Sequence, residues 1–244
     1  MQILHGFNNL PSFCHPVATV GSYDGVHCGH RIIIDEVVRR AKTIGGESIL
    51  LTFEPHPRIT LQQDEGLRLL TTLEEKARLL ESCGVDYLLV IPFDITFSHL
   101  SHEEFISDYI IGRLGVEELV IGYNHHFGHN KSGNYAYLSE KGGILRVTEV
   151  KQHLVGEQKV SSTIIRQTIE RGDMALAAQL TGHPYIIIGM ADENGFIATD
   201  KYKLLPPQGC YKATINDLPC EVIVNELGVE LGRAFAFTKS IIAL

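Results

Sequence analysis

The segment from Gly21 to His30 carries the side chains best suited to chemistry in this chain. It follows an apolar run and leads into a helical pattern, so its glycines permit a tight turn and a close approach of the backbone to a ligand. A helix start also offers unpaired N–H groups and the positive end of a dipole, both of which favour phosphate. His27 and His30 are near enough in sequence to share one pocket and donate to phosphoryl oxygens. The segment therefore predicts a phosphate-binding turn.

A second group of polar side chains lies at a predicted helix start. Ser161, Ser162 and Thr163 are followed by Arg166 one turn later. Hydroxyls, free N–H groups and a guanidinium together form an arrangement that can bind polyphosphate. Taken alone, the same residues are typical of an N-cap followed by a surface arginine. The presence of the first segment favours the phosphate clamp.

Two further histidine-containing segments have structural alternatives. His56 lies between two prolines, which restrict the backbone and stiffen a loop, and a rigid turn is the alternative to a binding role. His125, His126 and His129 lie close enough together to suggest metal ligands. No Cys, Asp or Glu completes a familiar ligand spacing there, so we predict no protein metal site.

The elements that position these segments follow from the hydrophobic pattern. Strands are expected at 17–21, 48–53, 87–91 and 118–121, and helices at 31–43, 73–83 and 102–114. Two helix starts carry capping boxes, Thr72-x-x-Glu75 and Ser101-x-x-Glu104. Nearly continuous apolar strands that alternate with helices are typical of a parallel sheet covered on both faces. We predict an α/β, doubly wound, Rossmann-like domain, which would bind ligands beyond the carboxyl ends of its strands.

The pattern changes towards the end of the chain. Helices are expected at 162–170 and 174–180, and short β-type runs separated by turns follow Gly182. We place a boundary near His183, which gives a domain at 1–183 and a small β-rich appendage at 184–244. The appendage is close to the lower size limit for independent folding.

Composition limits the classes of partner. With 44% hydrophobic and 20% charged residues, the chain is typical of a globular protein, and its formal charge of −8 offers no basic face for nucleic acid. No apolar run is long enough to span a bilayer, and the first residues do not form a secretory signal. Five scattered cysteines form neither a disulfide framework nor a zinc module. We expect a cytoplasmic protein without a membrane or nucleic-acid partner.

The pattern Gly-x-x-Asp-Gly-x-His-x-Gly-His in the first segment resembles the nucleotide-binding signature of the prokaryotic bifunctional riboflavin kinase/FAD synthetase family, a branch of the His-x-Gly-His nucleotidyltransferases. Three more blocks follow in order. Residues 52–57 are similar to the family's Thr-Phe-x-Pro-His-Pro block, and 122–128 with Gly133 to its Gly-x-(Asp/Asn)-x-x-Phe-Gly block. Residues 160–166 are similar to its Ser-Ser-Thr-x-x-Arg block. The resemblance covers about residues 10–190.

This resemblance implies transfer of AMP from ATP, bound with Mg²⁺, to FMN, with release of pyrophosphate. The expected catalytic residues, which stabilise charge in the transition state, are His27, His30 and Arg166. The expected ATP-binding residues are Gly21, Ser22, Tyr23, Asp24, Gly25, Gly29, Ser161, Ser162 and Thr163. The expected acceptor-binding residues are Pro55, His56, Pro57, Asn124 and Phe127, with Phe127 also in a packing role. Asn124 is neutral where many relatives carry Asp, so no role that needs a carboxylate is assigned to it.

Two alternatives to FMN transfer stay open. Similar chemistry serves other acceptors, namely phosphopantetheine, nicotinate mononucleotide and glycerol phosphate, and the fold could also serve a non-catalytic flavin- or nucleotide-binding protein. The resemblance also implies that riboflavin kinase activity is lost. Residues 204–211 look like the kinase's Leu-Pro-x-x-Gly-Val-Tyr segment, but its Gly-Phe-Pro-Thr-Ala-Asn segment is missing between 189 and 204. The appendage would then be a β cap, or a contact between copies of the chain in a homo-oligomer.

Overall fold

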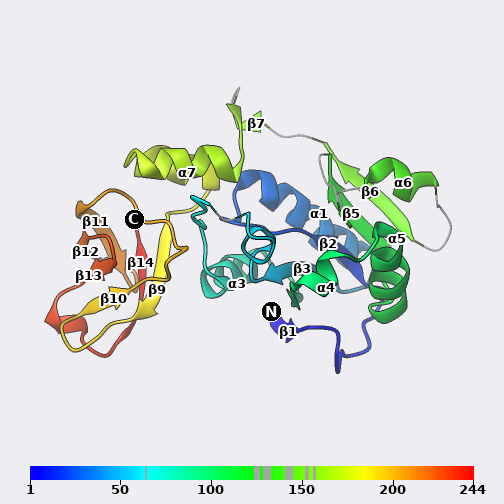
Figure 1. The fold of residues 1–244 in the computed structure, drawn as a ribbon, viewed down its shortest axis with the longest axis horizontal. Coiled ribbons are helices and arrows are strands. Elements are labelled where there is room, and N and C mark those ends of the chain that lie inside the picture. Colours follow the sequence, from blue (N-terminus) through cyan, green and yellow to red (C-terminus); the bar gives the residue numbers. More distant parts are fainter. Residues whose placement is uncertain (64, 124–126, 129–132, 141–144, 152–153, 156–157) are drawn as a thin grey trace. The chain divides into compact units, whose positions relative to one another are not determined.

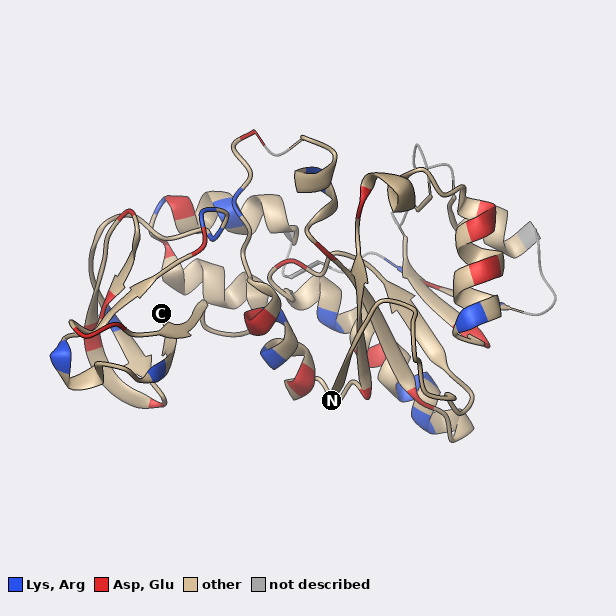
Figure 2. Ribbon diagram, turned by 60° about the horizontal axis from the view of Figure 1, so that its bottom comes forward, with Lys and Arg blue, Asp and Glu red and all other residues tan. Residues whose placement is uncertain are grey.

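The computed structural model describes residues 1–63, 65–123, 127–128, 133–140, 145–151, 154–155 and 158–244 (Figure 1). Within these ranges, none of the helices combines the length and apolar content that crossing a membrane requires. Acidic and basic residues are interspersed along the helices (Figure 2). On α1 (Cys28–Ile44), for example, Arg31 and Arg39 flank Asp35 and Glu36, so this helix carries both signs of charge.

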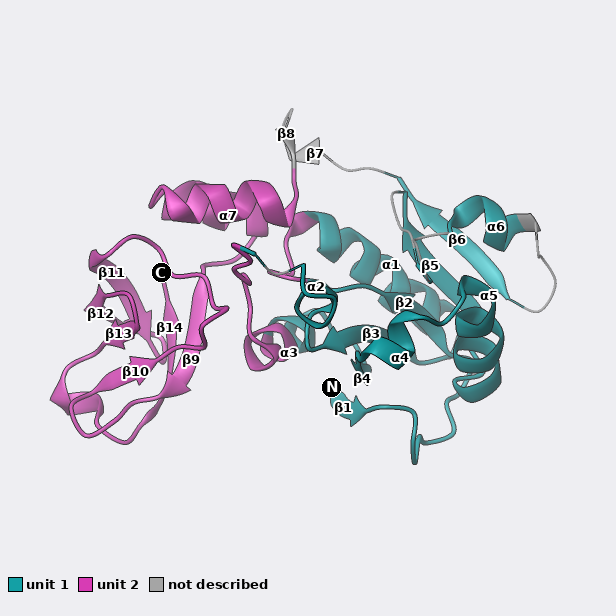
Figure 3. Cartoon of the chain, viewed as in Figure 1, with its two compact units in different colours: residues 1–23, 29–65, 79–153 teal, residues 24–28, 66–78, 154–244 magenta. Residues whose placement is uncertain are grey.

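The chain divides into two compact units, each made of several chain segments (Figure 3). The first unit contains residues 1–23, 29–65 and 79–153, and the second contains 24–28, 66–78 and 154–244. The second unit thus includes two short segments from the first third of the chain. The predicted domains 1–183 and 184–244 stay a prediction, and the compact units follow a different division.

A six-stranded parallel sheet forms the centre of the first unit. Its strands, in spatial order, are β1 (Gln2–His5), β4 (Tyr87–Pro92), β3 (Ser48–Glu54), β2 (Val17–Val20), β5 (Glu118–Gly122) and β6 (Arg146–Val150). Every neighbouring pair is parallel, which confirms the predicted sheet type. The four predicted strands are present, and β1 and β6 extend the sheet at its edges. Neither edge strand carries a buried apolar run, so the sequence pattern did not reveal them.

Helices cover both faces of this sheet. Besides α1, the helices in the chain segments of the first unit are α2 (Pro57–Thr60), α4 (Ile95–Ser98), α5 (His102–Glu104), η1 (Phe105–Arg113) and α6 (Tyr135–Glu140), and α3 (Leu73–Ser82) begins in the second unit and ends in the first. Val17 of β2 packs with Val37 of α1, whereas the next residue, Ala18, packs in another cluster with Phe105 of η1. Because successive side chains of a strand point to opposite faces, α1 and η1 lie on opposite sides of the sheet. The doubly wound prediction is therefore confirmed at the level of a helix-covered parallel sheet.

The predicted helix at 102–114 is present, but most of it is not an α-helix. A single α-helical turn begins at the predicted capping box of Ser101 and Glu104, and the chain continues as a π-helix, η1. Phe105 and Ile110 lie five positions apart, and both are buried in the same core cluster. A wider helix with i to i+5 bonds places both side chains on that face, which an α-helix would not do as well.

A six-stranded antiparallel sheet forms most of the second unit. Its strands, in spatial order, are β10 (Phe196–Ala198), β13 (Gly228–Glu230), β12 (Leu218–Val224), β11 (Gly209–Ile215), β14 (Lys239–Ala243) and β9 (Ile186–Met190). The shorter elements are the pair β7 (Leu154–Val155) and β8 (Gln158–Lys159), and the 3-10 helix η3 (Arg233–Phe235). The sheet curls, because a Cβ placed on Gly189 of β9 would lie 2.4 Å from Ile197 of β10, the strand at the other end of the order.

Two helices belong to the core of the second unit. They are α7 (Ser162–Glu170) and α8 (Met174–Thr181), as the sequence predicted. Ile165 of α7 and Leu180 of α8 are buried in one cluster with Val222 of β12 and Ile242 of β14. Leu70, from the segment 66–78, lies in the same cluster. The helices after residue 160 therefore share a hydrophobic core with the β-rich end of the chain.

Candidate functional site

The predicted phosphate-binding turn starts in the first unit, directly after β2. The backbone N–H of Gly21 donates to the carbonyl of Leu51 at 3.0 Å, which continues the sheet pairing by one residue. Tyr23 is 3% exposed, and its hydroxyl lies 2.6 Å from Thr19 Oγ1. A Cβ on Gly21 would lie 2.9 Å from the Tyr23 ring. Gly21 is therefore the residue that leaves room for this ring.

The imidazole of His30 lies against the same tyrosine. The ring centroids of Tyr23 and His30 are 5.1 Å apart, and the planes meet at 68° in an edge contact. Helix α1 begins at Cys28, three residues earlier than predicted, so Gly29 and His30 occupy its first turn. That turn contains no acidic residue. The first amide groups of a helix and the positive end of its dipole suit an incoming anion.

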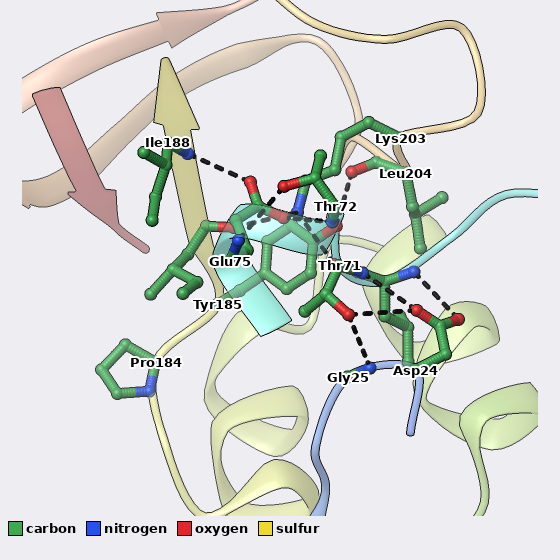
Figure 4. A network of polar contacts seen from close by, with 12 residues as sticks. Asp24, Gly25, Thr71, Thr72, Glu75, Pro184, Tyr185, Ile188, Lys203 and Leu204 are labelled. Carbon is green, nitrogen blue, oxygen red and sulfur yellow. Dashed lines mark hydrogen bonds and ion pairs between the residues drawn. The ribbon is translucent and has the colours of Figure 1, made fainter. Parts of the chain in front are cut away.

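The carboxylate of Asp24, in the second unit, is held by donors of the protein itself (Figure 4). It accepts the backbone N–H groups of Leu70 at 3.1 Å and Thr71 at 3.0 Å, and the Thr71 hydroxyl at 3.3 Å. Arg166 Nη2 lies 2.6 Å from Asp24 Oδ2, and the Asp24 side chain is 4% exposed. Four donors use the lone pairs that a carboxylate offers. Asp24 is thus placed to organise the turn, and its direct contact with ATP stays a prediction.

The guanidinium of Arg166 joins two chain segments. Its Nε donates to the carbonyl of Arg68 at 2.6 Å, and its Nη2 pairs with Asp24. The side chain is 18% exposed, so this is a mostly buried, charge-assisted contact. The third nitrogen, Nη1, is outside these two bonds.

The serines before Arg166 have different partners. Ser161 is the N-cap of α7, with its hydroxyl accepting the Ile164 N–H at 3.4 Å. The Ser162 hydroxyl donates to the carbonyl of Asp24 at 3.1 Å, and Thr163 is exposed. The N-cap interpretation is thus confirmed for Ser161. Ser162 contacts the predicted phosphate-binding turn, and phosphate binding by these residues stays a prediction.

His27 has an unusual electrostatic environment. The residue is 6% exposed, and burial lowers the pKa of its imidazole to about 4. The negative charge of Asp24 opposes this shift, while Arg166 and His183 add to it. His27 is therefore neutral at neutral pH and can donate one N–H and accept one hydrogen bond.

Gly25 is seated between three residues of the second unit. Its N–H donates to the Thr71 hydroxyl at 3.0 Å, and its carbonyl lies 3.0 Å from His183 Nε2. Its φ is +82°, and a Cβ at this position would lie 2.6 Å from Leu70 Cδ1. Glycine is required here both by its backbone angle and by its neighbour.

Sequence reasoning missed the three partners of Gly25, which are Leu70, Thr71 and His183. Thr71 directly precedes the capping box of Thr72 and Glu75, so its backbone position was a usable signal. His183 marked only the predicted boundary, and nothing in its surroundings indicated a partner 158 residues away.

The proline-flanked loop follows β3 in the first unit. His56 is the N-cap of α2, and its Nδ1 accepts the Arg58 N–H at 3.3 Å. Pro57 occupies the first helical position, where its missing N–H costs nothing. Pro55 is exposed, and His56 and Pro57 are half-buried. The structure thus supports the stiff turn, and contact of these residues with an acceptor stays a prediction.

The third block is described only in part. Phe127 is 8% exposed and packs against Phe105 with ring centroids 6.3 Å apart. Its backbone pairs with Gly133, where a Cβ would lie 2.5 Å from the Phe127 ring. The predicted Asn124, and the histidines at 125, 126 and 129, lie outside the described residues. In the described part of the chain, no group of three or more His, Cys, Asp and Glu residues could hold a metal ion.

A family model and curated relatives indicate one family. A family model described as FAD synthetase matches residues 11–164. A bifunctional riboflavin kinase/FMN adenylyltransferase from Escherichia coli strain K12 is 34% identical over 194 residues, which are 78% of this chain and 62% of that protein. A protein of the same description from Bacillus subtilis strain 168 is 33% identical over 215 residues, covering 82% of this chain and 68% of the relative. The chain thus spans about two thirds or less of the length of these relatives.

One solved structure has a similar fold over nearly the whole chain. It is described as a macrolide-efflux protein from Streptococcus pneumoniae, and it matches with a TM-score of 0.82. The match covers 99% of this chain and 88% of the other, at 22% identity. At that identity the match shows the fold alone. Because the match covers 99% of this chain, the matched part includes the six-stranded antiparallel sheet of the second unit.

Proposed function

Because this chain belongs to the FAD synthetase family, we propose that it transfers the AMP part of ATP to FMN, with formation of FAD and pyrophosphate. The observation that carries the proposal is the contact between the first and last of the ordered sequence blocks. Asp24 of the first block binds Ser162 and Arg166 of the last. Residues that the resemblance assigns to nucleotide binding are therefore joined to one another by partly buried hydrogen bonds.

The reaction needs positioning more than acid–base chemistry. A phosphate oxygen of FMN attacks the α-phosphorus of ATP, and the bond from that phosphorus to the bridging oxygen breaks. Pyrophosphate leaves with the electron pair. The attacking phosphate is already ionised at neutral pH, so no base has to remove a proton. The protein must align the two anions and stabilise the charge that grows on the α-phosphate and the leaving group.

We assign this stabilisation to His27, His30 and Arg166. His27 is neutral at neutral pH, so it brings no charge of its own to the turn, and His30 lies in the first turn of α1, where a helix start suits an anion. Arg166 uses Nε and Nη2 within the protein, so Nη1 is the nitrogen proposed to reach a phosphate. The remaining proposed ATP contacts are Gly21, Ser22, Tyr23, Asp24, Gly25, Gly29, Ser161, Ser162 and Thr163.

The acceptor contacts are proposed on the first unit. They are Pro55, His56, Pro57, Asn124 and Phe127. The capping of α2 by His56 gives this loop a fixed geometry, which favours a defined binding surface.

Magnesium enters the proposal as part of the substrate MgATP. Asp24 is the carboxylate nearest the predicted phosphate contacts in sequence, and protein donors already occupy it. The described residues also hold no cluster of three metal ligands. This donor set fits an ion that is held by phosphate oxygens and water, the usual arrangement for Mg²⁺ with nucleotides.

An end-product assay tests the proposed function. The purified chain with ATP, Mg²⁺ and FMN is expected to yield FAD and pyrophosphate in equal amounts. His30→Ala is expected to lower kcat/KM. The decrease should correspond to a loss of about 2–4 kcal/mol in transition-state stabilisation, which is typical for removal of one preorganised donor. Turnover of phosphopantetheine or a nicotinate nucleotide in place of FMN would move the assignment to another acceptor. Binding of FMN without pyrophosphate release would favour the non-catalytic alternative.

We also propose that the chain does not phosphorylate riboflavin. The support is internal to the sequence: the segment between β9 and residue 204 lacks the Gly-Phe-Pro-Thr-Ala-Asn pattern of the family's kinase. Phosphoryl transfer depends on positioning and charge neutralisation, so loss of the residues that engage metal and nucleotide is expected to abolish it. Incubation with riboflavin, ATP and Mg²⁺ should give no FMN above the background without protein. Sustained formation of FMN would refute this part of the proposal.

A further inference from the structure

The ammonium group of Lys203 is buried inside the second unit. The side chains of Lys203 and its partner Glu75 are each 1% exposed. The Nζ atom donates to Leu70 O at 2.8 Å, Glu75 Oε2 at 2.6 Å and Ile186 O at 2.9 Å (Figure 4). These three acceptors use all three N–H bonds of the ammonium. Nζ also lies 4.2 Å from the ring centroid of Tyr185, so the cation is enclosed.

The backbone on either side of Lys203 forms hydrogen bonds with Leu69, next to the contact between Lys203 and Leu70. The N–H of Leu69 donates to Tyr202 O at 2.6 Å, and the N–H of Leu204 donates to Leu69 O at 2.8 Å. Leu69 and Lys203 therefore form a parallel β-bridge, and the Lys203 side chain then reaches the next carbonyl, that of Leu70. Three hydrogen bonds fix two consecutive residues of the segment.

Leu70 connects this arrangement to the predicted phosphate-binding turn. Its carbonyl accepts from Lys203, and its N–H donates to Asp24 Oδ2 at 3.1 Å. A Cβ on Gly25 would lie only 2.6 Å from Leu70 Cδ1, so the Leu70 side chain packs directly against Gly25. Leu70 therefore contacts the buried ammonium of Lys203 and also contacts Asp24 and Gly25. In the sequence, Asp24 and Gly25 directly precede Val26 and His27.

We propose that Lys203 is a positioning residue for the nucleotide-binding turn, acting through Leu70 on Asp24, Gly25 and His27. Its effect on nucleotide rests on the proposed function, whereas its effect on the turn does not. Buried ion pairs often add little net stability compared with apolar residues of the same size. A geometric role, in which the three acceptors define where the segment at 69–71 lies, explains this lysine better than stability alone.

The β-rich end of the chain takes part in this positioning. The Lys203 side chain also binds Ile186 O of β9, and Glu75 Oε1 accepts the Ile188 N–H of the same strand at 3.0 Å. The sheet is thereby tied to the segment that holds Asp24. In this view the sheet supports adenylyl transfer whether or not a kinase site exists.

The experiment compares three variants of the full chain. Lys203→Met removes the ammonium and keeps an unbranched side chain. The double variant Lys203→Met with Glu75→Gln removes the unpaired carboxylate as well, so that at least one variant without the ammonium is expected to fold. Val222→Ala is the matched control, because Val222 is 1% exposed in β12 of the same unit and its side chain takes no part in these hydrogen bonds. Each variant is measured at the same number of degrees below its own Tm.

Amide hydrogen exchange is the readout that does not depend on activity. Without the ammonium, peptides covering 24–28 and 69–72 should exchange about tenfold faster or more, with β11 and β12 little changed. Val222→Ala should show the opposite pattern. Unchanged exchange at 24–28 in both ammonium-free variants would overturn the inference, as would the same increase in Val222→Ala.

Kinetics test the link to nucleotide. If the wild-type chain makes FAD, the ammonium-free variants should raise KM for ATP about tenfold or more and leave KM for FMN within about twofold. Equal changes in both constants would contradict a positioning role at the nucleotide turn. If the wild-type chain makes no FAD, the proposed function fails, and the exchange data still decide whether Lys203 positions the turn.

Discussion

Two groups of ion pairs in this molecule use the same side-chain chemistry in different ways. On α1, Glu36 pairs with Arg39 and Arg40, three and four positions along the same helix, and the Arg39 side chain is 60% exposed. At the phosphate-binding turn, Asp24 pairs with Arg166 across 142 residues of sequence, with side chains 4% and 18% exposed. The first group links neighbours on a helix surface, whereas the second links distant segments inside a unit.

The difference shows where a charge pair determines structure. Water can solvate Glu36 if its arginines are removed, so the pair on α1 contributes little. Removal of one partner from a buried pair leaves a charge without water or counter-charge, which is costly. We therefore expect substitutions in the two groups to differ strongly, although the distances between charged atoms are similar.

The largest effect is expected from Asp24→Ala. This change leaves the mostly buried Arg166 without its carboxylate and the N–H groups of Leu70 and Thr71 without acceptors. We expect the free energy of unfolding to fall by about 3–5 kcal/mol, measured by urea denaturation at pH 7. Asp24→Asn, which keeps acceptor atoms, should lose less. A loss below about 1 kcal/mol in Asp24→Ala would break the contrast between the two groups.

An intermediate effect is expected from the burial of His27. Its pKa of about 4 in the folded chain lies below the ordinary value of 6.5, so the unfolded chain binds more protons between these values. Stability is then unaffected by this group above about pH 7 and falls as the pH drops from 6.5 towards 4, by at most about 3 kcal/mol. His27→Gln should remove this part of the pH dependence. Unfolding curves at several pH values would show parallel profiles for both proteins if His27 were solvated.

The smallest effect is expected from Glu36→Gln. Hydrogen bonds from Arg39 are the largest cause that lowers the pKa of Glu36 to about 2. The folded pKa is below the ordinary value, so the stabilisation is present above about pH 4.5 and is lost as the pH falls towards 2. We expect a loss under about 1 kcal/mol at pH 7, reduced further by added salt. Thermal melts in low and high salt would measure it, and a loss as large as that of Asp24→Ala would remove the distinction.

Features that depend on neighbouring residues could be predicted from the sequence, whereas features that depend on contacts between distant residues could not. The strands and helices of the first unit could be predicted because each carries its own apolar pattern, as the burial of all four residues of β2 illustrates. Glu75 shows both the success and its limit. Its capping role is local, and the bonds between Thr72 and Glu75 at 2.8 and 3.3 Å confirm it. Its pairing with Lys203 spans 128 residues, and no local pattern indicates it.

The candidate site divides in the same way. The first and last blocks could be located from residue types and spacing, since Gly21 and Ser161 have roles that their neighbours in sequence define. The partners that position them, Thr71 and His183 among them, come from segments whose own patterns indicate only a helix start and a boundary. Long-range polar contacts depend on the completed fold, so a linear pattern does not contain them.

The discontinuous second unit also has a consequence for synthesis of the chain. Strands β2, β3, β4 and β5 all lie before residue 123, so the centre of the parallel sheet can assemble early. Asp24 and Glu75, by contrast, cannot reach Arg166 and Lys203 until those residues have left the ribosome. Such non-local contacts form slowly, because a long loop must close first. The turn encoded within the first 30 residues is therefore among the last parts of the molecule to complete its hydrogen bonds.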